Sequence, residues 1–250
     1  MCDVKSTCTE NQSAFRFAAV QSVYKVPVKF HGDICVSRSP ASSNRTTARV
    51  GRPPRSAQQS AEVRGRVIEV ARRLFADEGF EAVSMRRIAA ESGCAPMTLY
   101  GYFHSKNEIL HFIWEVFFEE LFVRVAQAAK HRGSAATRLR NACSAYLGYW
   151  MEFPDRYRMV YLNQDHTGDG ERYYVDESSV IERHAMFREL IEAAQAQADA
   201  WPGDVQLMAE TLFCGLQGIA HSLVTIPEYP WLPMDQLLEQ TLRTILKPKA

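Results

Sequence analysis

Between Met97 and Lys106 the chain gathers side chains that can donate hydrogen bonds or make apolar contacts. The candidates are Met97, Thr98, Tyr100, Gly101, Tyr102, His104 and Lys106. Thr98 can offer a hydroxyl or a methyl group to a base edge, and Met97 can contact a thymine methyl group. Tyr100, Tyr102 and Lys106 suit phosphate oxygens, which position a protein on a duplex without specifying sequence. This combination favours contacts with double-stranded DNA.

Two arginines stand a little earlier, at the start of a predicted helix. Arg86 and Arg87 place positive charge where it opposes the helix dipole. A phosphate lying opposite Arg86 would explain this placement, and a solvated surface charge is the alternative. We therefore include Arg86 among the candidate DNA contacts.

An arginine-rich arm precedes all of these residues. Residues 37–60 are rich in Ser, Pro and Arg and contain no acidic residue, and their Gly51-Arg52-Pro53 core is like the centre of an AT-hook. Arginines on a flexible arm suit the narrow minor groove of A·T-rich DNA. Arg52 and Arg55 are the candidate contacts, with a solvated tail as the alternative.

The elements that must position these residues are short helices. Ser84–Phe103 is expected to form two helices separated by a turn at Ser92-Gly93, because glycine tolerates positive φ. The second helix should begin at Ala95 or Pro96 and end near Phe103. An earlier helix should end at Gly79 and share one core with this pair. That predicted core is Val67, Ala71, Leu74, Phe75, Met85, Ile88, Ala89, Leu99 and Phe103.

With these residues in place, the segment Arg66–Leu110 resembles the DNA-binding domain of the TetR family of transcriptional regulators. The resemblance is carried by Ala71–Phe80, Ile88-Ala89, Gly93, Thr98-Leu99-Tyr100, Tyr102-Phe103, Ser105-Lys106 and Leu110. It implies a three-helix head whose third helix enters the major groove, with Tyr100 and Lys106 near phosphates. Ala95, where Ser is frequent, departs from the family pattern and should lose an N-cap worth about 1 kcal/mol.

The rest of the chain is expected to be all-α. A long helix should start after Ser105 and stop near Arg132, and five more are predicted at 135–152, 155–163, 175–199, 204–225 and 234–247. We therefore divide the chain into a disordered arm (1–60), a DNA-binding domain (61–121, with its helix-turn-helix at 84–103) and a C-terminal domain (122–250).

The resemblance implies that the C-terminal domain forms a homodimer and, as in many members, holds an effector pocket. The candidate pocket residues are Tyr146, Trp150, Phe153, Tyr157, Tyr161, Phe187, Phe213, Gln217 and His221. Each aromatic residue taken alone could equally be plain core. We expect a small apolar or aromatic effector.

Two stretches, Tyr149–Tyr161 and Leu212–Leu223, are similar to a TetR subclass with a Trp-x-x-x-His-Gly signature. Phe213 and Gln217 take the Trp and His places. Gly218 could allow two subunits to approach closely, so 204–225 and 234–247 are the predicted dimer helices.

The charge distribution agrees with this division. The 250 residues carry no net charge, but residues 37–106 have 12 Lys and Arg against 6 Asp and Glu, whereas residues 107–250 have 13 against 20. A basic segment attracts phosphate while an acidic body is repelled by it. We expect no apolar run of this sequence to be long enough to span a membrane. We expect a cytoplasmic protein whose six cysteines are reduced and mostly buried.

These features predict a sequence-specific transcriptional regulator, namely a repressor that a small-molecule effector releases from a palindromic operator. The alternative is a helical binding protein that keeps the helix-turn-helix as a scaffold without DNA activity. An enzyme is disfavoured, because the sequence offers no catalytic constellation, metal-ligand spacing or cofactor motif.

Overall fold

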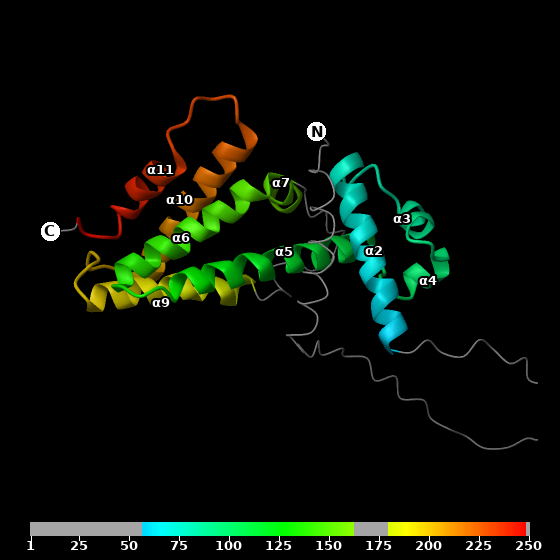
Figure 1. Ribbon diagram of the computed structural model, residues 1–250, viewed down its shortest axis with the longest axis horizontal. Coiled ribbons are helices and arrows are strands. Elements are labelled where there is room, and N and C mark those ends of the chain that lie inside the picture. The colour runs from blue at the N-terminus through cyan, green and yellow to red at the C-terminus, as the bar shows by residue number, and fades with distance from the viewer. Residues whose placement is uncertain (1–56, 163–179, 249–250) are drawn as a thin grey trace, which may run out of the picture. The chain divides into compact units, whose positions relative to one another are not determined.

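A computed structural model describes residues 57–162 and 180–248, which all belong to the compact unit Pro53–Ala250. Within these ranges the chain forms helices and no strand, as predicted, apart from one isolated antiparallel bridge between Ala200 and Leu246 (Figure 1). The helices are α2 (Ala57–Glu78), α3 (Met85–Glu91), α4 (Pro96–Tyr100), α5 (Lys106–Ala129), α6 (Ala135–Glu152), α7 (Pro154–Tyr161), α9 (Val180–Ala196), α10 (Val205–Thr225) and α11 (Met234–Leu242).

The head consists of α2, α3, α4 and the first turns of α5. Gly79 follows α2 at φ +83° and Gly93 lies between α3 and α4 at φ +67°. Both glycines thus occupy the left-handed region that the predicted turns require. The predicted core of the head is buried except for Met85, which is half-buried and packs against it.

Capping differs between the two helices of the helix-turn-helix. The hydroxyl of Ser84 accepts a hydrogen bond from the amide of Arg87, so α3 has a side-chain cap. Ala95 at the start of α4 makes no such bond, as expected from its side chain. The helix α4 ends at Tyr100, three residues before the predicted end, although the amides of Tyr102 and Phe103 still bond to the carbonyl of Leu99.

The arm boundary also requires a correction. The helix α2 begins at Ala57, so residues 57–60 are helical rather than part of a disordered arm. Arg52 and Arg55 lie outside the described residues. The domain boundaries at 61–121 and 122–250 remain predictions.

The long helix α5 runs from the head into the body. Ser105 caps it by accepting a hydrogen bond from the amide of Glu108. Its buried side chains extend along its whole length: Ile109, Leu110 and Ile113 pack in the head, and Phe117, Leu121 and Val125 lie further along. The helix packs against α2 at one end and against α6 and α9 further along. One rigid element therefore belongs to both parts of the protein.

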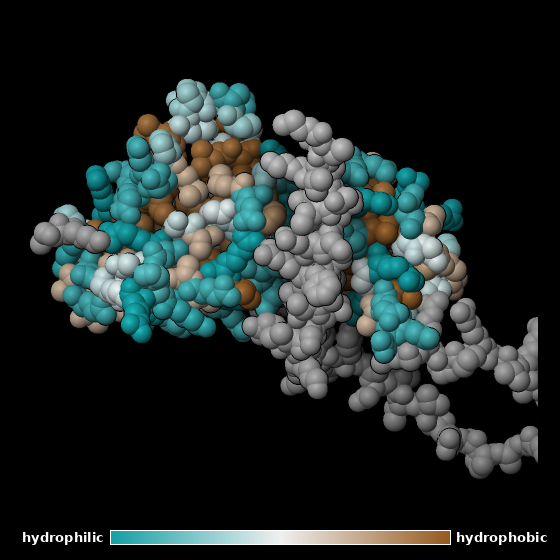
Figure 2. All heavy atoms as spheres, viewed as in Figure 1, coloured by the Kyte–Doolittle hydropathy of each residue, from teal (hydrophilic) through white to brown (hydrophobic). Residues whose placement is uncertain are grey.

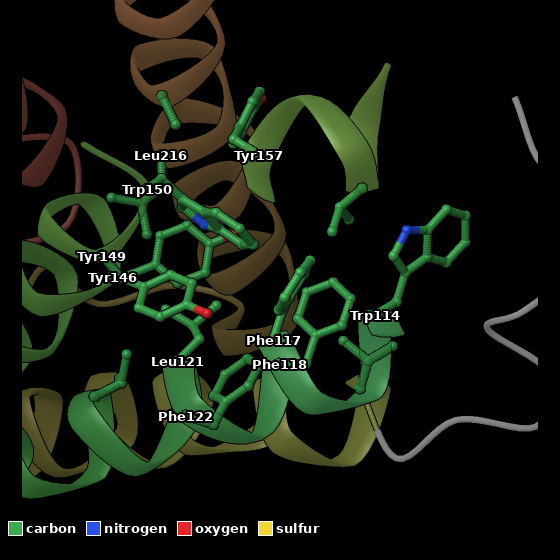
Figure 3. Packing of buried hydrophobic residues seen from close by; sticks show 14 of the residues in the cluster. Trp114, Phe117, Phe118, Leu121, Phe122, Tyr146, Tyr149, Trp150, Tyr157 and Leu216 are labelled. Atoms are coloured by element: carbon green, nitrogen blue, oxygen red, sulfur yellow. The ribbon is translucent and has the colours of Figure 1, made fainter. Parts of the chain in front are cut away.

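The body packs its helices around an aromatic core. Trp150, Tyr146, Tyr149 and Tyr157 are among the largest fully buried side chains of the described residues. Figure 3 shows aromatic side chains of α5 and α6 directed toward one another, and the rings of Phe118 and Trp150 meet edge to face at 6.2 Å. Such edge-to-face pairs add to the stabilisation from buried area.

The helix α10 departs from two expectations. It is long and apolar enough to cross a membrane by length and composition, contrary to the sequence-based expectation, yet only 22% of that stretch is buried. Cys214 on this helix is exposed, whereas Cys143 is buried as predicted. A single such helix is weak evidence for a membrane span, because an uncovered subunit interface has the same composition. Figure 2 shows apolar atoms gathered around α10.

Candidate nucleic-acid interface and effector cavity

The outer surface of α4 carries the residues predicted to contact bases. Met97 is 84% exposed and Tyr100 is 46% exposed, while Leu99 on the opposite side is fully buried. Gly101 and His104 are also exposed, whereas Thr98 and Tyr102 are half-buried. Met97 and Tyr100 are therefore accessible to a partner of the head.

The loop between α4 and α5 is held by hydrogen bonds. The carboxylate of Glu108 accepts one bond from the backbone amide of His104 at 2.6 Å and lies 3.1 Å from its Nδ1. The backbone amide of Glu108 in turn donates a hydrogen bond to the hydroxyl of Ser105. This reciprocal arrangement resembles a capping box and fixes the direction in which α5 starts after α4.

Lys106 is engaged within the protein. Its ammonium donates a hydrogen bond of 2.6 Å to the carbonyl oxygen of Phe80 and lies 4.1 Å from the centre of the Phe80 ring. The side chain thus ties the start of α5 to the loop after α2. An ammonium has three donors, so a phosphate contact remains compatible with this bond.

The two arginines of α3 differ in their surroundings. The guanidinium of Arg87 lies 3.6 Å from a carboxylate oxygen of Glu78 and 3.3 Å from one of Glu91. Arg86 is exposed and has no ion pair or hydrogen bond among the described residues. Its charge is therefore the one left available for an external anion.

A cavity of about 800 Å³ opens between α5, α7, α9 and α10. Of the nine predicted pocket residues, Tyr161, Phe187 and Phe213 line it. The remaining wall is largely apolar and includes Trp114, Phe118, Val160, Val180, Ala209, Leu212 and Leu216. This volume and this lining are typical of sites for small organic molecules.

The other six predicted pocket residues lie elsewhere. Tyr146, Trp150 and Tyr157 are buried core. The guanidinium carbon of Arg156 lies 4.1 Å from the ring centre of Phe153. His221 is exposed on α10. These aromatic residues were predicted to line a pocket because helical periodicity alone cannot separate a cavity wall from the core behind it.

A polar cluster lies behind the cavity wall. The hydroxyl of Tyr146 donates a hydrogen bond of 2.9 Å to Gln217 Oε1, and the hydroxyl of Tyr161 lies 3.4 Å from that of Tyr146. Burial raises the pKa of both tyrosines. Their hydroxyls thus stay protonated at neutral pH. Gln217 supports the wall from behind.

His184 is a cavity residue that sequence reasoning did not select. Its Nδ1 lies 2.6 Å from the carbonyl oxygen of Val180, and its ring packs at 4.6 Å from Phe213 and 4.9 Å from Phe122. Burial lowers its pKa. The signal that could have found it is its spacing to Phe187 and Arg188, which places all three on one side of α9.

An ionic contact connects the cavity helix α9 to α5. Arg183, with its side chain 19% exposed, lies 2.6 Å from Glu115 and 3.0 Å from Glu119. Both carboxylates belong to α5, the helix that also packs in the head. A shift of α9 would therefore act directly on α5.

Comparison with known proteins identifies the head. The family model described as "Bacterial regulatory proteins, tetR family" matches residues 67–113. The activator FasR of Mycolicibacterium smegmatis is 29% identical over 126 residues, covering 50% of this chain and 54% of FasR. The repressor KstR2 of the same species is 24% identical over 159 residues, or 62% of this chain and 76% of KstR2. The match to FasR thus spans about half of that relative's length.

Solved structures share the fold beyond the head. A regulatory protein in the TetR family from Rhodococcus RHA1 has a TM-score of 0.60 at 18% identity over 75% of this chain and 99% of its own. The fatty acid degradation regulator FadR from Bacillus halodurans has a TM-score of 0.59 at 15% identity, covering 72% and 93%. At these identities the likeness concerns the fold alone. Residues 67–113 are thus a helix-turn-helix domain of the TetR family, and the described helices beyond them share the fold of solved TetR-family regulators.

Proposed function

We propose that the protein is a cytoplasmic repressor that binds a palindromic operator as a homodimer and leaves it when a small molecule occupies the cavity. The observation that carries this proposal is that the single helix α5 both contacts the head and lines the cavity. The helix contacts the head through Lys106, which is bonded to the carbonyl of Phe80, and through Phe112, whose ring centre lies 5.6 Å from that of Phe103. Its side chains Trp114 and Phe118 line the cavity. Ligand binding can therefore bias the orientation of the heads through one rigid element.

The surface of the head supports DNA binding. Met97 and Tyr100 project from α4, and the unpaired Arg86 stands on the neighbouring helix. Met97 suits a base edge, whereas Tyr100 and Arg86 suit phosphate oxygens. The alternative, a scaffold without DNA activity, gives no role to the exposed Tyr100 or to the unpaired Arg86.

Homodimer formation is supported by the open side of α10. Leu212, Leu216, Ala220 and Val224 are buried, whereas the opposite stripe is exposed and contains small or apolar residues: Leu207, Thr211, Cys214, Gly218 and His221. A second copy of this stripe would cover it and place two heads on successive major grooves. The relatives include an activator and a repressor. Repression, as opposed to activation, therefore needs its own test.

Gel shifts with the DNA upstream of the protein's own gene test the core of the proposal. We expect salt-sensitive binding that Tyr100→Ala weakens, with Tyr229→Ala as a control because Tyr229 is an exposed tyrosine distant in sequence from the head. Lys106→Ala would be a poor test because it also removes the bond to Phe80. Binding that is insensitive to both salt and Tyr100→Ala would contradict the proposal. A promoter reporter in a deletion strain distinguishes repression, where expression rises, from activation.

A further inference from the structure

The imidazole of His184 offers one hydrogen-bond acceptor at the cavity. A carbonyl oxygen can only accept, so the contact of 2.6 Å between Nδ1 and the carbonyl of Val180 requires the proton to be on Nδ1. The other ring nitrogen, Nε2, then carries a lone pair. Nε2 is buried and has no hydrogen-bond partner among the described residues. A buried polar atom without a partner is unfavourable, and a donor group that reaches it gains binding energy.

The surroundings of the ring are aromatic and uncharged. Phe122, Phe187 and Phe213 pack around it, and Phe213 and Phe187 also line the cavity. Because Nε2 is buried, a ligand donor reaches it only when one of these rings moves aside, and Phe213 is the half-buried one. Burial keeps the imidazole neutral by lowering its pKa. This part of the wall therefore suits a neutral donor and disfavours an ionised group.

Charged groups of the cavity wall lie on its exposed side. The guanidinium of Arg188 is 3.3 Å from Gln206 Oε1, and the amide of Gln206 donates a bond of 2.6 Å to Glu210. All three side chains are exposed. The single arginine in the wall is thus linked to a carboxylate through one amide, and the wall as described holds no buried cation to pair with an anionic ligand.

We propose that the cavity selects an uncharged, mainly apolar ligand with a hydroxyl group that donates to Nε2 of His184. The inference deepens the proposed function and rests on it, since it assigns the chemical class of the effector. It excludes ligands whose buried end is an ionised carboxylate, and it makes His184 a determinant of specificity.

Three probes of matched shape test this class: 4-octylphenol, 4-octylanisole and 4-octylbenzoate. The phenol can donate a hydrogen bond, the anisole cannot, and the benzoate is charged. We expect calorimetry with the full chain to give a Kd for the phenol about tenfold below that for the anisole, which corresponds to one hydrogen bond. The benzoate should bind more weakly than the phenol. In His184→Phe the phenol should lose this advantage while the anisole keeps its affinity.

The controls separate recognition from folding. His131→Phe replaces an exposed histidine that follows α5 and lies outside the cavity wall, and it should leave the phenol-to-anisole ratio unchanged. The retained affinity of His184→Phe for the anisole shows that the cavity is intact. Equal binding of phenol and anisole, tightest binding of the benzoate, or no binding of any probe would each overturn the inference. DNA binding in the gel shift is measured independently, so the proposed function can stand when this inference fails.

Discussion

At the level of single residues, Arg86 and Arg87 form a natural comparison. They are adjacent and both exposed, but two carboxylates already offset the charge of Arg87. Positive charges that bind phosphate release counterions, so each one contributes to the salt dependence of binding. An unpaired arginine should contribute more than a paired one.

We therefore predict that Arg86→Ala weakens operator binding and reduces the slope of log K against log salt by about 1. Arg87→Ala is the matched control and should change the slope less, because its charge is shared with Glu78 and Glu91. Fluorescence anisotropy over a salt series measures both slopes. A larger change from Arg87→Ala would assign the phosphate contact to the wrong arginine.

His184 gives a prediction on pH dependence. Its pKa in the folded protein lies below the ordinary value of 6.5, because burial disfavours the charged imidazole. As the pH falls below 6.5, the imidazole of His184 is protonated more readily in the unfolded chain than in the folded protein. Acid therefore favours unfolding. The stabilisation associated with the neutral ring is complete above pH 6.5 and declines as the pH falls.

We expect urea denaturation to show a smaller loss of stability from pH 7.5 to pH 5.5 in His184→Phe than in the wild type. The other histidines are common to both proteins, so their contributions cancel in the comparison. An identical pH dependence would mean that His184 is as easily protonated in the fold as in the unfolded chain, contrary to its burial.

At the level of elements, the contact between α10 and α11 depends on Gly215. A methyl group added there would lie 2.5 Å from Cγ2 of Thr241, which is closer than such atoms approach. The hydroxyl of Thr241 is bonded to the carbonyl of Leu237, so this β-branched side chain cannot easily turn away. The two helices can approach only because position 215 has no side chain.

Gly215→Ala should accordingly lower the free energy of unfolding by about 1–3 kcal/mol, the range for overpacking. Gly148→Ala in α6 is the control, since nothing lies within 4 Å of an added methyl group there. That change should be neutral or stabilising, because alanine favours helices by about 1 kcal/mol. Equal unfolding free energies for the two variants would show that α11 can move away without loss.

The elements themselves were largely predictable from sequence. The boundaries of α6 and α10 agree with the predictions to within one residue, since Ser134 and Asp204 cap them and Pro154 and Ile226–Pro233 follow. The cavity was not predictable in the same way. Tyr146 and Tyr161 share the same chemistry and differ only in whether a neighbouring helix covers them. Coverage by another element is a tertiary property, so it leaves no local signal.

At the level of the whole molecule, the open side of α10 requires an explanation. The helix is apolar by composition but mostly uncovered, with Leu207 64% exposed. Exposed apolar stripes of this kind mark interaction surfaces. In the homodimer that we propose, a second copy of the same chain would match the stripe to itself, as a two-fold axis demands. The basic head segment and the acidic body would then orient the pair on DNA.

Gly218 lies within this stripe, and an added methyl group would meet nothing within 4 Å in the single chain. Gly218→Arg should thus leave the folded subunit intact but place an unpaired charge in the proposed interface, which is strongly unfavourable when desolvated. We expect light scattering to report a monomer at micromolar concentration, and gel shifts to show loss of palindrome binding with unchanged circular dichroism. Ser144→Arg, at an exposed position of α6, is the matched control and should remain dimeric. A dimeric Gly218→Arg would move the interface away from α10 and leave its apolar side to another partner.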